Sequence, residues 1–468
     1  MAKKKTQVDD IERGIFDKKN PFEFDKISDK GLTEEIVREI SKEKNEPEWM
    51  LDMRLEGLKQ FYMQDNPTWG PDISEVNIDD IITYIKPKSD MKGSWEELPE
   101  NIRNTFYDLG IPQAEIDSLA GVGAQYDSEV VYHRMKDYLL EQGVIYTDME
   151  TAVREYPEIV KEHFMKVIKP NLHKYAALHY AVWSGGSFVY VPKGVKVDVP
   201  LQSYFRLNAP GAGQFEHTLI IVEEGAYCHF IEGCSAPKYN VVNIHAGAVE
   251  LYVKDGSTLR YSTIENWSRN MYNLNTKRAV VGKDAKIEWI SGSFGSKVSM
   301  LYPTSILKGE NAKSEYVGIS FAGSGQNIDT GSQVIHAAPN TTSTTESRSI
   351  SKGGGIASYR GLLYFTENSQ GSKASSDCES LMLDNESVSD NIPSIIEEND
   401  DIDVGHEAKI GRIDDEQIYY LMTRGIPENE AKAMLVRGFA EPIAKELPME
   451  YAVEMNTLIN LELEGTIG

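Results

Sequence analysis

Turn-forming residues recur at a nearly constant interval through the middle of this chain. They lie 31, 31, 28, 27, 29 and 28 residues apart, and in order they are Gly194, Gly225, Gly256, Asp284, Asn311, Asn340 and Asn368. Glycine, asparagine and aspartate tolerate the left-handed backbone that a tight corner requires. Because a fixed period of corners is typical of coils stacked on one another, the repeat predicts a β-solenoid.

The segments between the corners are rich in β-branched and aromatic residues, as in Ser187–Val191 and His217–Val222, which favours strands. Hydrophobic residues at helical spacing flank this region on both sides. We therefore expect a mainly β protein, with a parallel β-helix core between an N-terminal and a C-terminal α-helical domain. The expected boundaries are a flexible arm over 1–30, an N-terminal helical domain over 31–165, the β-helix over 166–390, and an acidic linker with a C-terminal helical domain over 391–468.

The composition argues against several classes of partner. The net charge of −25 over 468 residues disfavours nucleic acid and anionic membrane surfaces, because both need a basic footprint. The chain has no run of eighteen apolar residues and no apolar core of a signal peptide, which predicts a cytoplasmic protein. It also lacks a P-loop sequence, so we expect no ATP hydrolysis by the chain itself.

The repeat also predicts which side chains face inward. Positions three and five residues after each corner are mostly apolar, which places odd offsets inside the coil. At offsets seven and nine this column turns polar, with Trp267 at offset eleven; its polar members include Glu232, Thr263, Ser291, Cys234, Glu265, Ser293 and Ser320. Two interpretations stay open at this point. A bulge near Gly233 would return these side chains to the surface, whereas an unbroken register would make them a polar strip inside the solenoid.

The chain has three cysteines, a sparse and odd count that predicts reduced thiols rather than a disulfide framework. Cys228 falls in the apolar column and is interpreted as a buried packing residue. Cys234 follows a glycine and precedes a turn, so we expect an accessible, reactive thiol. Cys378 lies in the last coil. The pair His406–Glu407 is either ordinary surface polarity or, brought together with a cysteine, part of a mixed site suited to iron or zinc.

A set of motifs runs along nearly the whole chain, and it includes Glu46-Pro-Glu-Trp-Met, Tyr204-Phe-Arg-Leu-Asn, Glu232-Gly-Cys-Ser-Ala-Pro, Tyr261-Ser-Thr-Ile-Glu-Asn-Trp, Asp377-Cys-Glu-Ser-Leu and His406-Glu-Ala. In these motifs the chain resembles the SufB/SufD family, which serves the SUF iron–sulfur cluster assembly system. The resemblance implies a right-handed parallel β-helix between helical ends, in agreement with the repeat. It also implies an assembly scaffold rather than an enzyme.

The resemblance further implies roles for individual residues. Cys234 would accept sulfane sulfur as a persulfide, and Cys378 with His406 and Glu407 would hold iron while a transient cluster grows. The residues that match a sulfur path between these two sites are Arg206, Asn208, Thr263, Glu265, Trp267 and Lys277. Two positions depart from the family pattern: Glu265 stands where some relatives have glutamine, and Gly405 replaces an acid.

Partners are implied by the same resemblance. They are an ABC-type ATPase of the SufC type, a SufD-type sister subunit or a second copy of the chain, a cysteine desulfurase with its sulfur carrier, and apo iron–sulfur proteins. The C-terminal helices between Asp414 and Leu463 would dock the ATPase. Two other functions stay open: a SufD-like structural subunit without its own cluster, and a β-helix enzyme acting on carbohydrate. The sequence does not decide the cluster type or whether a flavin takes part.

Overall fold

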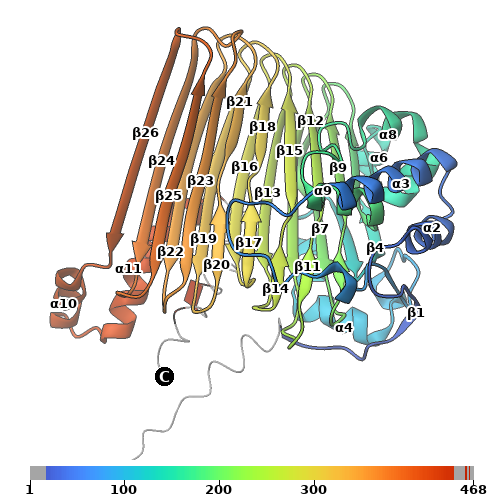
Figure 1. Ribbon diagram of the computed structural model, residues 1–468, viewed down its shortest axis with the longest axis horizontal. Helices are drawn as coiled ribbons and strands as arrows, with labels where there is room; N and C mark the ends of the chain where they lie inside the picture. The colour runs from blue at the N-terminus through green and yellow to red at the C-terminus, as the bar shows by residue number, and fades with distance from the viewer. Residues whose placement is uncertain (1–16, 447–458, 461–462, 464–468) are drawn as a thin grey trace, which may run out of the picture.

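In a computed structural model the chain winds into a solenoid of two long β-sheets, whose coils lie side by side (Figure 1). The structure describes residues 17–446, 459, 460 and 463. Strands that follow one another by one coil pair in parallel, which confirms the predicted parallel β-solenoid. Within the described part of the chain, no helix is long and apolar enough to cross a membrane.

The first sheet has ten strands in the order β26-β24-β22-β19-β16-β13-β10-β7-β3-β4. Its eight solenoid strands are 9 to 11 residues long, so each presents several side chains to the interior. They are β7 (Lys196–Arg206), β10 (Tyr227–Ser235), β13 (Thr258–Asn266), β16 (Lys286–Phe294), β19 (Lys313–Ala322), β22 (Thr342–Ser351), β24 (Ser372–Met382) and β26 (Ile402–Arg412).

The second sheet faces the first and is built from shorter strands in two rows. One row contains β6 (Gly186–Val191), β9 (His217–Val222), β12 (Ala248–Val253), β15 (Thr276–Val281), β18 (Thr304–Leu307) and β21 (Gln333–His336). The other contains β8 (Gly213–Gln214), β11 (Asn243–His245), β14 (Met271–Asn273), β17 (Val298–Leu301) and β20 (Asn327–Thr330). Both rows meet at the long strand β23 (Ile356–Phe365), which also pairs with β25 (Val388–Glu397).

The predicted corners form a ladder along the solenoid. Six of the seven corner residues have a left-handed backbone, with φ between 52° and 72°. In the last coil the left-handed residue is Gly371 rather than Asn368. Each corner N–H donates to a carbonyl in the next corner at 2.7–3.1 Å, from Gly194 through to Gly371. The corners are therefore stacked by hydrogen bonds as well as shaped by residue type.

The N-terminal region combines helices with strands, although a helical domain was predicted. Its helices are α2 (Glu34–Glu43), α3 (Glu48–Met63), α4 (Glu100–Asp108), α5 (Ile111–Ser118), α6 (Asp137–Glu141), α7 (Met149–Glu155), α8 (Pro157–His163) and α9 (Lys174–Val182), with short 3-10 turns at Ile78–Asp80 and Trp95–Glu97. Its strands are β1 (Phe24–Ile27), β2 (Ile85–Pro87), β3 (Gly121–Tyr126), β4 (Glu129–Met135) and β5 (Ile145–Asp148). Because β3 pairs with β7 and β5 pairs with β6, this region covers the first edge of both sheets.

The segment predicted as an acidic linker continues the solenoid. β25 pairs with β23, and β26 pairs with β24 over its whole length. Both strands belong to the last coil and are largely exposed, which allows their charged sequence. The predicted boundary at residue 390 therefore falls inside β25. The charged residues that suggested a boundary belong to exposed strands and do not mark the end of the sheet.

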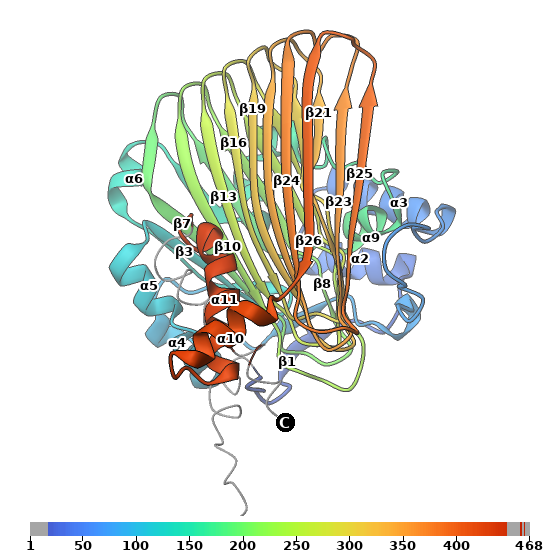
Figure 2. The ribbon, with the colours of Figure 1, turned by 90° about the vertical axis from the view of Figure 1, so that its left-hand side faces the viewer.

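Of the C-terminal helices expected between Asp414 and Leu463, the structure contains α10 (Asp415–Thr423) and α11 (Glu428–Ala444). The rest of that range lies mostly outside the described residues. α11 packs on the outer face of the ten-stranded sheet through Val436, Ala440 and Ile443 (Figure 2).

The interior at offsets three and five is the apolar core. Cys228 is fully buried there, as predicted. Beside it an aromatic ladder crosses the strands: ring centroids of Phe230 and Tyr261 are 5.9 Å apart, and those of Tyr261 and Trp289 are 5.5 Å apart. This ladder, at offset five, separates the apolar core at offset three from the polar rows at offsets seven and nine.

Replacement of a corner glycine tests the role of backbone conformation. At Gly256, where φ is +65°, an added Cβ would meet no atom closer than 3.9 Å, so strain rather than a clash decides the outcome. We expect Gly256→Val to lower the free energy of unfolding by about 1–2 kcal/mol, and Gly256→Asn to lower it less, because asparagine tolerates this conformation. Urea denaturation measures both. Equal losses of unfolding free energy in the two variants would contradict the assignment of Gly256 to a left-handed corner.

Candidate functional site

The polar column recognised in the sequence runs inside the solenoid. Strands β10, β13, β16, β19, β22 and β24 pair in parallel with an unbroken register. Gly233 lies opposite Ile264 in this ladder, without a bulge between these strands. The surface interpretation is therefore wrong. Glu232, Thr263 and Glu265 are buried and bind side chains of the facing sheet.

Lys277 on β15 is the centre of this polar interior. Its Nζ donates to Thr263 Oγ1 at 3.2 Å and to Glu265 Oε1 at 3.1 Å, and Glu232 Oε1 lies 3.6 Å away. All four side chains are at most 3% exposed. Burial acts to lower the pKa of Lys277, but the ion pairs with Glu265 and Glu232 outweigh it and raise that pKa. Glu232 was not among the predicted site residues, although its position at offset seven of the inward column indicated it.

Cys234 is buried, which contradicts the predicted accessible thiol. It is 1% exposed and packs in an apolar cluster with Trp267. Gly233 does not open a path to it, because the ring of Tyr204 covers that glycine; a Cβ there would meet Tyr204 Cδ2 at 2.6 Å. Burial, and then the charge of Glu232, raise the pKa of the Cys234 thiol well above its ordinary value. The resting side chain is therefore a protonated thiol.

Trp267 borders a second buried polar pair. Its ring lies 4.7 Å from that of His245, whose Nε2 contacts Glu216. On the other side, His245 Nδ1 and Asn273 Oδ1 are 2.7 Å apart, and Asn273 Nδ2 donates to Glu265 at 2.5 Å. A continuous line of buried polar side chains thus leads from Glu216 to the lysine cluster. His245 on β11 and Glu216, which directly precedes β9, were not predicted, because the offsets from the corners describe only the long strands of the first sheet.

Two residues of the expected sulfur path lie elsewhere. Arg206 pairs in register with Ser235, so strand alternation turns it away from the inward face. Its guanidinium donates to Ser235 Oγ at 3.1 Å and to the Lys18 carbonyl at 2.9 Å. Asn208 Oδ1 accepts the backbone N–H of Asn20 at 3.1 Å. These two side chains hold the N-terminal segment against the first coils and do not join the lysine cluster.

Cys378 lies on the inward face of the penultimate strand of its sheet. Counted from the true corner Gly371, it stands at offset seven, the offset of Glu232. The column between them passes through Thr263, Ser291, Gly318 and Ser347. The side chain is 2% exposed and contacts Asn391 and Tyr359 of the facing sheet. Burial raises the pKa of the Cys378 thiol to about 12, and these two contacts only partly oppose it.

The strand β26 carries the expected His406–Glu407 pair. His406 pairs with Ser376 and shares the inward face of Cys378; its Nε2 is buried and has no hydrogen-bond partner among the described residues. Glu407 alternates to the outer face, where it pairs with Lys409 at 3.2 Å. Strand geometry therefore separates Glu407 from the other two candidates. Among the residues that the structure describes, no group of three His, Cys, Asp or Glu side chains could hold a metal ion, and Cys378, His406 and Glu407 do not form one.

Two family models together match most of the chain. The one described as SUF system FeS cluster assembly, SufBD core domain, covers residues 205–439, and the SufBD protein N-terminal region covers residues 38–203. The chain belongs to the SufB/SufD family.

Curated relatives agree with this assignment. The iron–sulfur cluster assembly protein SufB of Bacillus subtilis is 52% identical over 468 residues, which is all of both chains. SufBD family proteins of Staphylococcus haemolyticus and Staphylococcus aureus are also 52% identical, over 468 and 472 residues and again over the full length of both chains. Membership of the SufB/SufD family gives this protein a role in iron–sulfur cluster assembly.

The N-terminal motif of this SufB/SufD protein has a structural role. Arg54 is fully buried and forms a two-point ion pair with Glu46, with N···O distances of 2.6 and 2.8 Å. The guanidinium also donates to the carbonyls of Ala181 at 3.1 Å and Trp183 at 2.9 Å, at the end of α9. The motif thus ties α3 to α9 and takes no part in the polar interior.

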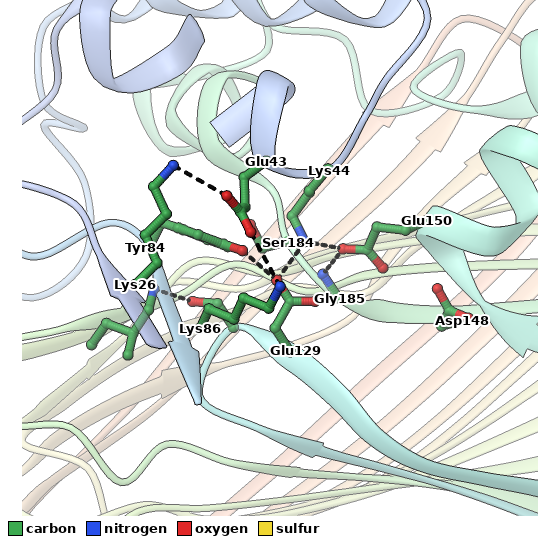
Figure 3. Close-up of polar contacts among 12 residues, drawn as sticks. Lys26, Glu43, Lys44, Tyr84, Lys86, Glu129, Asp148, Glu150, Ser184 and Gly185 are labelled. Carbon is green, nitrogen blue, oxygen red and sulfur yellow. Dashed lines mark hydrogen bonds and ion pairs between the residues drawn. The ribbon is translucent and has the colours of Figure 1, made fainter. Parts of the chain in front are cut away.

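A second charged cluster joins the N-terminal region to the first coil (Figure 3). Lys44 Nζ lies 3.0 Å from Glu129 Oε1 and 2.5 Å from Glu150 Oε1. Glu150 also accepts the N–H of Gly185 at 2.6 Å, and Tyr84 donates its hydroxyl to Glu129 at 2.6 Å. The cluster borders a cavity of about 390 Å³. Its members come from five separate segments, so no local motif in the sequence indicated it.

Thiol labelling tests the burial of the cysteines. With a pKa of about 12, roughly one Cys378 side chain in ten thousand is a thiolate at pH 8, against about a quarter for a free cysteine. We expect iodoacetamide to label Cys234 and Cys378 at least about a thousandfold more slowly in the native chain than in urea. Mass spectrometry of digested samples measures this. Rapid labelling of Cys234 in the native chain would contradict its burial and support the accessible thiol that the sequence predicted.

Removal of the buried ammonium tests the lysine cluster. Lys277→Met leaves two buried carboxylates without their cation, so we expect it to lower the free energy of unfolding by about 3–5 kcal/mol. The matched control is Lys286→Met, which breaks more exposed ion pairs and should cost about 0–1 kcal/mol. Denaturant titration of both variants decides the matter. Similar losses in the two would show that the cluster carries no special stability.

Proposed function

We propose that this SufB/SufD protein is the scaffold on which iron–sulfur clusters are assembled de novo. Cys234 accepts sulfane sulfur as a persulfide, and the cluster grows at Cys378 with His406 as a further ligand. The cluster is cargo that is later transferred to apo-proteins. One observation carries the proposal: both cysteines open onto the same polar half of the solenoid interior, in adjacent columns of one continuous ladder.

Unpaired polar atoms support a hydrated interior between the two cysteines. Trp267 Nε1, Ser293 Oγ and both amide atoms of Asn275 are buried and have no hydrogen-bond partner among the described residues. The same holds for both amide atoms of Gln214, beside His245 in the second sheet. Buried polar groups are normally paired, and those that are not paired within the protein bind ordered water. A wet interior suits a polar sulfur species.

The step at Cys234 is a persulfide transfer. The Cys234 sulfur attacks the terminal sulfur of the donor persulfide, the S–S bond of the donor breaks, and the departing donor thiolate takes up the proton that Cys234 loses. In the resting state the raised pKa and the burial keep this thiol unreactive. The donor, a desulfurase with its sulfur carrier, must therefore stabilise an opened state of the coil. Between deliveries the closed coil shields the thiol from oxidation.

The open end of the solenoid supports a partner chain at Cys378. Iron–sulfur clusters are commonly held by four ligands, and a single chain supplies two at this end. The terminal strands expose Ile395, Ile396 and Ile410 to between 42% and 48%, and an exposed apolar strand edge favours pairing with another chain. A SufD-type sister subunit or a second copy docked there would add the missing ligands. A site completed only by assembly holds its cluster reversibly.

The C-terminal helices offer a surface for the ATPase partner. On α10, Tyr419, Tyr420 and Met422 are 69%, 57% and 42% exposed. Aromatic residues and methionine are enriched at protein interfaces. Because the chain has no P-loop, an ABC-type ATPase bound to this helix would hydrolyse the ATP.

Cysteine variants test the proposal in anaerobic reconstitution with the desulfurase, its carrier, the ATPase and the sister subunit. We expect Cys234→Ser to lose the persulfide and at least tenfold of the rate of cluster formation, because no thiol receives sulfur. Cys378→Ser should keep the persulfide and lose the cluster. Mass spectrometry detects the persulfide, and absorption and Mössbauer spectra detect the cluster.

The control is Cys228→Ala, which removes a buried packing thiol and should assemble clusters at nearly the wild-type rate. Wild-type rates in both Cys234→Ser and Cys378→Ser would contradict the scaffold function and favour a SufD-like structural subunit.

A further inference from the structure

Residues 17–27, here called the N-terminal strap, cover the end of the coil that holds Cys234. Phe24 and Ile27 of β1 pack against the apolar cluster that contains this thiol. In both ribbon views β1 lies toward the lower end of the long strands, which is where β10 ends (Figures 1 and 2). The strap is therefore part of the cover that keeps Cys234 from solvent.

One asparagine provides most of the hydrogen bonds that hold the strap. The backbone N–H of Asn20 donates to Asn208 Oδ1 at 3.1 Å. Its side-chain Nδ2 lies 2.8 Å from both Thr105 Oγ1 and the Tyr126 hydroxyl, and 3.2 Å from the Asn101 carbonyl. These partners belong to α4, to β3 and to the segment that follows β7, so Asn20 fastens the strap to three separate parts of the molecule.

Arg206 joins the strap to the strand of the cysteine. Its guanidinium donates to the Lys18 carbonyl at 2.9 Å and to Ser235 Oγ at 3.1 Å. Ser235 directly follows Cys234 in β10. Arg206 is fully buried, so its hydrogen bond to the strap is shielded from water and stronger than an exposed one. Together with Asn20, it forms a latch beside the thiol.

The other sides of Cys234 cannot open without damage to the solenoid. β10 pairs in parallel with β7 on one side and with β13 on the other, and the ring of Tyr204 lies over Gly233. The strap belongs to neither large sheet: among the described residues β1 pairs with β2 alone, and no residue of β1 is fully buried. Segments with few buried contacts open at the lowest free energy, and a two-stranded sheet is marginally stable by itself.

We propose that the N-terminal strap is the part of the cover that opens when a persulfide-bearing protein reaches Cys234, and that Asn20 and Arg206 form its latch. This rests on the proposed function of Cys234 as sulfur acceptor. Release of the latch uncovers the apolar cluster of the thiol and separates no strand of the two large sheets. Arg206 and Asn208 then act at the surface of the first coils, where they hold the strap closed between deliveries.

Thiol labelling of strap variants tests the latch in the full-length chain. Asn20→Ala removes the side-chain hydrogen bonds of the latch, and Phe24→Ser removes an apolar contact of the strap with the Cys234 cluster. The matched control is Asn240→Ala, which changes an exposed asparagine in the loop after β10.

The buried thiols Cys228 and Cys378 serve as references within the same molecule. A buried thiol reacts through an opened state, so its labelling rate follows the population of that state. We expect iodoacetamide to label Cys234 at least about tenfold faster in both strap variants than in the wild-type and control chains. Labelling of Cys228 and Cys378 should stay within about twofold of wild type.

Two results of the labelling would overturn the strap. One is a wild-type labelling rate of Cys234 in both strap variants, which would place the opening elsewhere. The other is an equal increase at all three cysteines, which would show global unfolding rather than a local opening.

Hydrogen–deuterium exchange tests the link to the sulfur donor. The wild-type chain is compared with and without an excess of the persulfurated carrier protein, and we expect the backbone amides of residues 17–27 to exchange at least about fivefold faster with the carrier. Unchanged or slower exchange would overturn the role of the strap in delivery. If mass spectrometry of the same samples finds no persulfide on Cys234, the proposed acceptor function fails, and the delivery role with it, whereas the labelling rates would still show whether the strap covers the thiol.

Discussion

The unbroken parallel register of the long strands from β10 to β26 is the constraint on which the rest of this structure depends. The backbone N–H of each corner donates a hydrogen bond to a carbonyl of the next corner, and each strand pairs with the strand one coil later. Residues at equal offsets from their corners therefore form columns along the solenoid. A slip of one residue would send every inward side chain outward. The register therefore keeps the apolar rows, the aromatic ladder and the polar rows separate from β10 onward.

Ion pairs stabilise the charged side chains of the polar rows, because an isolated charge in this buried interior would be strongly destabilising. Lys277 stays charged because Glu265 and Glu232 outweigh the effect of burial, and the same carboxylates help to keep Cys234 protonated. One cluster thus stabilises the interior and suppresses the reactivity of its thiol. A thiol that is unreactive at rest suits a protein that must hold sulfur only when a donor delivers it.

Much of the fold and part of the site followed from residues that act through local rules. The corners were recognisable because only a few residue types adopt φ near 60°, and the parity of offsets placed Cys228, Thr263 and Glu265 correctly. The prediction of an acidic linker was wrong, because β25 and β26 form by pairing with strands of earlier coils and not through their own composition. Glu407 was grouped with His406 by adjacency, although neighbours in a strand face opposite sides.

The sequence by itself determined the period of the solenoid, the position of six of its seven predicted corners and the alternation of inward and outward side chains. Each of these depends on backbone conformation or on neighbours along the chain. Only the tertiary structure decided that Cys234 is covered, that Arg206 faces away from Lys277, and that His245 and Glu216 extend the polar interior. The physical reason is that burial, ion pairing and pKa depend on atoms from other coils and from the facing sheet, whose spacing in the sequence follows no single period.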